Sequence, residues 1–325
     1  MQNINDIYSN HPEQMLPPDS AIAADHRNPR RRDRQPVELE VGTLVQPEPR
    51  HALELLVLHE SAKTDLLAGL RSIEKRADME RVWNISRIQP QDGRCLLNFY
   101  GEPGTGKTRA ALAIAWRLGK SLYQVDYSTI ISKYLGDTAK HITLAFKRAA
   151  ELDAVLFFDE ADSLLSKRVD MNESCATSLN QNRNVLMQCL DRFNGVVIMT
   201  TNLFGNYDPA LLRRIARHIK FDLPDAAMRR RLFELHLPNP QRVTADLSEL
   251  AKASQGFSGG DIFNVCLNAI YAGSVHDNPK CWRVTQPLLM AEIAKISEAK
   301  EQHRHRPRLR SNGPIGFCQS VELAR

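Results

Sequence analysis

The sequence predicts an α/β protein, in which a parallel sheet has helices on both faces and a small all-α domain follows it. Short apolar segments alternate with segments of helical periodicity from residue 95 to residue 223. Strands that are apolar along their whole length are typical of parallel sheets covered on both faces. From residue 225 onward the apolar residues recur only at helical spacing, which indicates a separate helical domain.

Composition narrows the class of protein. The chain has 325 residues, of which 42% are hydrophobic and 25% charged, and these values match a globular protein with room for one large and one small domain. Its six cysteines show no CxxC spacing, so we interpret them as reduced thiols and expect neither a disulfide framework nor a zinc site. No apolar run approaches the ~20 residues of a membrane-spanning helix, and the N-terminus lacks the pattern of a secretory signal. We therefore expect a cytoplasmic protein without membrane association.

Four segments are expected along the chain. Residues 1–50 are rich in Pro, Asn, Asp and Arg without any sustained period, so we expect a largely disordered segment. Residues 51–224 are expected to form the large α/β domain, and residues 225–302 a small helical lid domain. Residues 303–325 are expected to form a basic flexible tail. The net charge is +5, and we interpret the short arginine-rich patches in the two terminal segments as solvated tails rather than as a nucleic-acid surface.

Each element is assigned from its periodicity. Leucines at helical spacing predict one long helix after a short entry, from residue 51 to about residue 80. The strands of the sheet are expected at 95–100, 121–128, 154–158, 196–201 and 217–223. The helices that alternate with them are expected at 108–119, 138–152 and 182–193. Four further helical patterns, and no strand, are expected after Pro224.

The segment "GEPGTGKT" matches GxxxxGK[ST] between an expected strand and an expected helix. Its glycines allow backbone N–H groups to turn inward around phosphates, and the following helix presents its positive end to them. Lys107 would reach the β- and γ-phosphates, and the Thr108 hydroxyl would hold Mg²⁺. We expect the nucleotide to bind to Gly101, Pro103, Gly104, Thr105, Gly106, Lys107 and Thr108.

Two carboxylates follow the apolar segment "AVLFF". Asp159 and Glu160 would lie at the carboxyl end of a buried strand, where α/β sheets bind ligands. Asp159 would hold the magnesium ion through water, and Glu160 would polarise the attacking water. Asn202 ends the next strand, where its amide could orient that water. Phosphoryl transfer requires positioning and charge neutralisation, so these residues predict an ATPase that uses ATP and Mg²⁺.

Residues from about 51 to 302 resemble a single AAA+ module of the classical AAA clade. The motifs "GEPGTGKT", "VLFFDEAD", "VVIMTTN", "YDPALLRRI" and "GFSGGDI" occur in the order of that family. The resemblance implies a P-loop fold and a homo-oligomeric ring, usually a hexamer, with ATP bound between neighbouring subunits.

The resemblance also assigns site residues. It gives Asn202 the sensor-1 role, and it places Gly259 and Gly260 near the adenine and ribose. Arg213 and Arg214 fall where such proteins have arginine fingers, which reach the neighbouring subunit's γ-phosphate. Without the family, a pair of arginines on a helix would be interpreted as solvated.

The segment "SKYLGDTAK" matches the first pore loop of the family. Lys133, Tyr134 and Leu135 would intercalate with the side chains of an extended polypeptide, and Gly136 would allow the loop to move. The alternative is that Tyr134 packs against its own domain.

The resemblance implies an ATP-driven remodeller that threads a protein substrate. The chain is similar to small stand-alone bacterial AAA proteins, some of which convert HORMA-type proteins in antiphage signalling while others serve contractile injection systems. A HORMA-type protein or an adaptor is therefore an expected partner. A nucleic-acid motor or loader is the first alternative, although a channel that grips DNA would more often carry Lys or Arg than Tyr134. An ATP-dependent switch or scaffold is the second.

Overall fold

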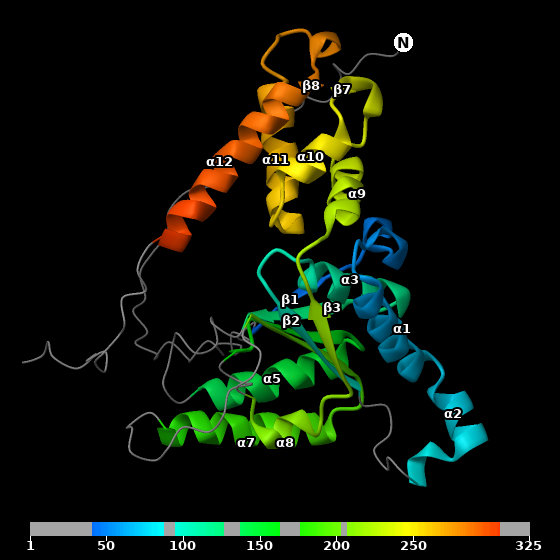
Figure 1. The fold of residues 1–325 in the computed structure, drawn as a ribbon. Coiled ribbons are helices and arrows are strands. Elements are labelled where there is room, and N and C mark those ends of the chain that lie inside the picture. Colours follow the sequence, from blue (N-terminus) through cyan, green and yellow to red (C-terminus); the bar gives the residue numbers. More distant parts are fainter. Residues whose placement is uncertain (1–40, 88–94, 127–136, 163–175, 203–206, 306–325) are drawn as a thin grey trace, which may run out of the picture. The chain divides into compact units, whose positions relative to one another are not determined.

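The computed structural model describes residues 41–87, 95–126, 137–162, 176–202 and 207–305. Within these ranges the chain contains a six-stranded sheet with helices on both faces and a separate group of helices (Figure 1). The predicted α/β class is confirmed. No helix in the described part of the chain is long and apolar enough to cross a membrane.

The sheet has the strand order β1-β3-β4-β5-β2-β6. Apart from β1 (Thr43–Val45), the strands are β2 (Cys95–Gly101), β3 (Leu122–Asp126), β4 (Val155–Asp159), β5 (Val196–Thr201) and β6 (Arg217–Phe221). All neighbouring pairs among these five strands are parallel, as expected. Because parallel strands end at the same edge, the residues that follow β2, β4 and β5 are brought together.

Helices cover both faces of the sheet. On one face lie α1 (Glu60–Glu74) and α3 (Lys107–Arg117), and on the other lie α5 (Thr138–Glu151), α7 (Ala176–Arg192) and α8 (Pro209–Leu212) (Figure 1). Phe157 and Phe158 are consecutive in β4 and fully buried, but they belong to opposite cores. Successive side chains of a strand point to opposite faces, so an uninterrupted apolar strand requires a core on each side.

The one long helix that was expected after a short entry at residue 51 is divided into two helices. Two short 3₁₀ turns, η1 (Pro49–His51) and η2 (Leu53–Leu55), precede α1, and α2 (Arg76–Trp83) follows it as a second helix. The leucines at 53, 56 and 58 pack against the α1–α3 core from outside any α-helix. Tertiary burial therefore overrides the helical spacing of these leucines.

A strand precedes these turns. β1 (Thr43–Val45) pairs antiparallel with β3 and forms an edge of the sheet. This differs from the expectation that residues 1–50 lack regular structure. A three-residue strand shows no measurable period, and it forms here because β3 offers it an edge.

The helices after Pro224 form their own core. They are α9 (Ala226–His236), α10 (Leu247–Ala253), α11 (Gly259–Ala272) and α12 (Gln286–His305), with Phe233, Leu250 and Ile262 fully buried among them. The expectation that no strand occurs here is wrong, because β7 (Val243–Thr244) and β8 (Val284–Thr285) form a short parallel pair. The remaining short elements are the 3₁₀ turns η3 (Ile85–Arg87), η4 (Pro240–Arg242) and η5 (Pro279–Cys281).

Candidate nucleotide-binding site

A cavity of about 420 Å³ lies at the carboxyl ends of β2, β4 and β5. The loop between β2 and α3 lines it from Pro103 to Thr108, together with Asp159, Glu160 and Asn202. The structure thus brings together residues that are up to a hundred positions apart in the sequence. Gly101 does not line this cavity, but its carbonyl accepts a hydrogen bond from Lys107.

Two glycines shape the loop. Gly106 has φ +99° and is the N-cap residue of α3, and Gly104 has φ +75°. A Cβ on Gly104 would lie 2.6 Å from Ser258 Oγ, while the Gly104 carbonyl accepts a hydrogen bond of 2.9 Å from the N–H of Gly260. The loop therefore contacts the start of α11 so closely that no side chain fits between them. Backbone N–H groups at a helix start, unobstructed by side chains, suit an anionic phosphate.

Lys107 is the cation of the site. It is only 9% exposed, and its Nζ donates to the carbonyls of Gly101 (2.7 Å) and Glu102 (3.0 Å) and to Asn202 Oδ1 (2.8 Å). Burial lowers the pKa of Lys107, and the carboxylates of the site, first Asp159, oppose that shift. A partly desolvated ammonium among oxygen acceptors is suited to the anionic oxygens of a triphosphate.

Asp159 accepts two hydroxyl hydrogen bonds. Thr200 Oγ1 donates to its Oδ1 at 2.6 Å, and Thr108 Oγ1 donates to its Oδ2 at 3.4 Å. A hydroxyl beside a carboxylate is the kind of oxygen pair that Mg²⁺ prefers. Among the described residues no group of three or more His, Cys, Asp or Glu could hold a metal.

Glu160 has a strained backbone. Its φ of 52° lies in the left-handed region, and its N–H donates to Thr200 Oγ1 at 3.1 Å. Such a conformation is uncommon for a residue with a side chain and is concentrated at functional sites. Its side chain is exposed and lines the cavity, where a carboxylate could accept a proton from water.

Thr200 was not predicted as a site residue, although its hydroxyl donates to Asp159 and accepts from the N–H of Glu160. The only signal in the sequence was a polar residue in an apolar strand.

Asn202 is held from two sides. Its Oδ1 accepts from Lys107, and its N–H donates to Asp162 Oδ1 at 3.1 Å. The Thr201 hydroxyl donates to the same carboxylate oxygen. Asp162 was not predicted as a site residue, although its place three residues after Asp159 in "DEAD" was a usable signal.

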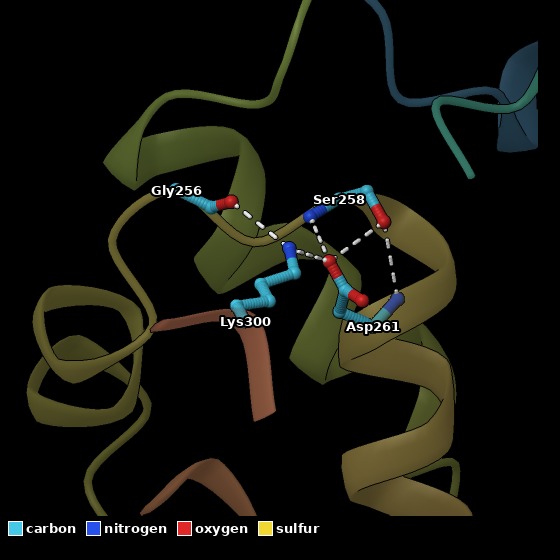
Figure 2. Close-up of polar contacts among 4 residues, drawn as sticks. All are labelled: Gly256, Ser258, Asp261 and Lys300. Carbon is cyan, nitrogen blue, oxygen red and sulfur yellow. Dashed lines mark hydrogen bonds and ion pairs between the residues drawn. The ribbon is translucent and has the colours of Figure 1, made fainter. Parts of the chain in front are cut away.

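The start of α11 lines the cavity with Gly259 and Gly260, and their place near the adenine and ribose stays a prediction. Ser258 and Asp261 form a capping box at this helix start. Figure 2 shows that the Lys300 ammonium and Ser258 converge on the carboxylate of Asp261. Lys300, from α12, also donates to the Gly256 carbonyl at 3.2 Å. The loop that presents the two glycines is therefore tied to the last helix.

The rest of the cavity is largely apolar and suits a planar base. Its lining includes half-buried leucines between residues 55 and 58, Met228 and Leu232. His236 and Phe263 also line it, with ring centroids 5.3 Å apart in an edge-to-face arrangement. Burial is the main cause that lowers the pKa of His236, which favours the neutral imidazole. These residues carried no motif, and only the fold could identify them.

The two predicted arginine fingers lie in different environments, and neither lines the cavity. Arg214 makes a bidentate ion pair with Asp191, at 2.9 Å from Nε to Oδ1 and 2.8 Å from Nη2 to Oδ2. Arg213 is exposed. The role of both side chains toward a neighbouring subunit stays a prediction.

The predicted pore-loop residues Lys133, Tyr134, Leu135 and Gly136 lie outside the described residues. Their contact with a polypeptide likewise stays a prediction.

Comparison with known proteins agrees with this geometry. Residues 97–223 match the model of the family described as "ATPase family associated with various cellular activities (AAA)". A 26S proteasome regulatory subunit 4 homolog B from Arabidopsis thaliana is 38% identical over 190 residues, which are 56% of this chain and 42% of the relative. A cell division cycle protein 48 homolog from Archaeoglobus fulgidus is 33% identical over 241 residues, 68% of this chain and 32% of the relative.

A third relative is of more similar length. It is a protein of Sinorhizobium fredii named uncharacterized AAA family ATPase y4kL, 36% identical over 227 residues, which are 69% of this chain and 66% of the relative. The chain spans less than half the length of the first two relatives.

Proposed function

We propose that this chain, whose residues 97–223 form an AAA ATPase domain, hydrolyses Mg-ATP in a homo-oligomeric ring, a hexamer, and uses the energy to remodel a protein substrate. One observation carries the ATPase part: Lys107, Asp159, Glu160 and Asn202 converge on one cavity from three strand ends. An apolar wall for a base and a glycine loop for phosphates meet in the same cavity.

Each residue has a role that follows from its position. The loop N–H groups and Lys107 hold the phosphates and orient the γ-phosphate. Mg²⁺, held by Thr108 and Asp159, would neutralise phosphate charge. The exposed carboxylate of Glu160 accepts a proton from the attacking water, and the amide of Asn202 orients that water. Positioning and charge neutralisation are what phosphoryl transfer requires.

The protein substrate is supported by similarity and by sequence. Two relatives are named as a proteasome regulatory subunit and a cell division cycle protein 48 homolog. The Tyr134 segment has the aromatic–aliphatic–glycine pattern of a loop that grips an extended polypeptide. A HORMA-type protein or an adaptor is the partner we propose. The four described cysteines are free, which agrees with a cytoplasmic site of action.

A substrate trap tests this proposal. Glu160→Gln should bind ATP but lower the turnover number by about 10²-fold or more, because the proton acceptor is lost. The trap is recovered from native lysate in ATP, and the chains that co-purify with it are identified by mass spectrometry. Glu160→Gln/Tyr134→Ala is the matched control, since it differs from the trap only in the aromatic side chain.

The outcomes separate the alternatives. A specific protein that the trap retains and the control loses supports remodelling and identifies the client. Nucleic acid bound equally by both variants would indicate a motor or loader. A wild-type protein that binds ATP without measurable turnover would indicate a switch or scaffold.

A further inference from the structure

A group of polar side chains is buried in the core between the sheet and α8. Asn98 lies in the middle of β2 and is 0% exposed. Its Nδ2 donates to the Tyr207 hydroxyl at 3.1 Å and lies 3.2 Å from Nδ1 of His218 in β6. Since an amide nitrogen only donates, His218 Nδ1 must accept, which places the imidazole proton on Nε2. Tyr207 and His218 stack with ring centroids 6.0 Å apart.

This arrangement is costly. Asn98 Oδ1 is buried and has no hydrogen-bond partner among the residues that the structure describes. A buried polar group left without a partner is destabilising, and an apolar residue at this position would avoid that cost. The neighbouring residues Leu97 and Phe99 show that β2 is otherwise built for apolar burial. A polar residue at this position therefore requires an explanation other than packing.

The hydrogen bonds continue from this group to the nucleotide cavity. The Tyr207 hydroxyl is hydrogen-bonded to the Thr201 side chain. Thr201 donates to Asp162, and Asp162 accepts the N–H of Asn202. Asn202 Oδ1 in turn accepts from Lys107 Nζ at 2.8 Å.

The bonds form one connected network. The Asn98 amide donates to Tyr207, the Tyr207 hydroxyl is bonded to the Thr201 side chain, and Thr201 donates to the Asp162 carboxylate. Hydrogen bonds that are connected in this way strengthen one another. Asn202 is exposed, so packing restrains it little, and its backbone is anchored by Asp162.

We propose that Tyr207 and Asn98 are positioning residues for ATP hydrolysis: through Thr201 and Asp162 they hold Asn202 where its amide orients the attacking water. The inference rests on the proposed ATPase function. It predicts that a residue without contact to the nucleotide sets the rate of hydrolysis. Nucleotide binding depends instead on the loop between β2 and α3 and on the apolar wall, and Asn98, Tyr207 and Thr201 do not line that cavity.

Tyr207→Phe removes the hydroxyl and keeps the ring stacked on His218. The turnover number for ATP should fall about 10-fold, the usual order for loss of a supporting hydrogen bond. The KM for ATP and the Kd for a fluorescent ADP analogue should stay within about twofold. Tyr123→Phe is the matched control, because Tyr123 is buried in the same core but lies on β3.

Thr201 supplies a second pair of variants. Thr201→Val removes the hydroxyl at constant volume and should reproduce the loss of turnover, whereas Thr201→Ser keeps the hydroxyl and should restore most of it. The Tyr207→Phe/Thr201→Val double variant should lose little more than either single variant, since both interrupt one chain.

Two results would overturn the inference. One is a Tyr207→Phe protein that turns over ATP within about twofold of wild type; the other is a Thr201→Val loss that Thr201→Ser does not relieve. Wild type and Glu160→Gln are assayed alongside. If wild type shows no turnover above Glu160→Gln, the proposed function fails, and that failure is distinct from a failure of the positioning chain.

Discussion

Gly104 lies where the phosphate-binding loop touches the start of α11. It has φ +75°, and an added Cβ would meet Ser258 Oγ at 2.6 Å. Gly119 has a similar φ of +66°, but a Cβ there would meet nothing within 4 Å. Both positions therefore carry the same kind of backbone strain, and they differ only in whether an added Cβ would collide with a neighbouring atom.

Replacing each of these two glycines with alanine distinguishes the effect of backbone strain from the effect of the clash with α11. Gly104→Ala and Gly119→Ala should each lower the free energy of unfolding by about 1 kcal/mol, because both place a side chain at positive φ. Only Gly104→Ala should weaken nucleotide binding, by about 10-fold, because the loop must move away from α11. Titration with a fluorescent ADP analogue measures this, and equal affinities for the two variants would contradict it.

His218 makes stability depend on pH. Its neutral Nδ1 accepts from Asn98, and burial lowers the pKa of His218 below its usual 6.5. The folded state thus disfavours protonation more than the unfolded state does. The free energy of unfolding should fall as the pH drops below about 6.5 and level off below the folded-state pKa.

The comparison is between wild type and His218→Phe. Urea denaturation at pH 7.5 and at pH 5.5, at one protein concentration, should show a smaller pH-dependent loss for the variant. His218→Phe is expected to be less stable than wild type at pH 7.5, because Asn98 loses an acceptor. An identical pH dependence in both proteins would assign the effect to other groups, such as His236.

At the scale of elements, α12 is tied to the start of α11. The Lys300 ammonium contacts Asp261 and the Gly256 carbonyl, and it lies 5.0 Å from the centre of the Phe257 ring. Asp261 also accepts from Ser258 N at 2.7 Å and from Ser258 Oγ at 2.8 Å (Figure 2). The last helix of the described chain therefore stabilises the cap that faces the phosphate-binding loop.

Lys300→Met should loosen this cap. Amide hydrogen exchange at the first turn of α11 should become several-fold faster, and the free energy of unfolding should fall by about 1 kcal/mol or less, because the pair is partly exposed. Lys295→Met is the matched control: Lys295 is on the same helix, and among the described residues its ammonium pairs only with Glu292, three residues earlier. Equal exchange rates at the first turn of α11 in both variants would show that the Lys300 contacts do not stabilise this helix start.

At the scale of the whole molecule, hydrolysis is proposed to require two subunits. Arg213 is exposed and does not line the cavity of its own chain, so we propose that it acts on the nucleotide of a neighbouring subunit. Arg214 is held by Asp191 and can help only by positioning this segment or by exchanging that partner. An arginine supplied in trans typically contributes about 10³-fold or more to the rate.

Mixing two inactive variants tests this requirement. Lys107→Ala should not bind nucleotide, and Arg213→Ala should bind it but hydrolyse it poorly. In mixed rings, an Arg213→Ala subunit can receive the arginine of a Lys107→Ala neighbour, so activity should rise above that of either variant alone. Activity that stays at the sum of the separate variants, although native mass spectrometry shows mixed rings, would exclude action in trans.

Local patterns predicted a large part of this molecule. The strands at 154–158 and 196–201 were visible as uninterrupted apolar segments, and the loop to Thr108 as a glycine motif before a helix. These features could be predicted because their determinants, period and backbone freedom, lie within a few neighbouring residues. The prediction of one long helix after a short entry was only partly correct, because the leucines at 53, 56 and 58 pack half-buried against the core of α1, α3 and the sheet from outside any α-helix.

The sequence by itself determined the α/β class, the phosphate-binding loop, the two acids Asp159 and Glu160, and Asn202. Only the tertiary structure showed that β1 completes the sheet, that Asp191 holds Arg214, and that Lys300 ties α12 to α11. It also decided that Asn98, Tyr207 and Thr201 join one hydrogen-bonded chain to Asn202. The physical reason is that each of these contacts joins residues far apart in the sequence. Such a contact does not change the pattern of apolar and polar residues around either partner, so a local pattern cannot predict it.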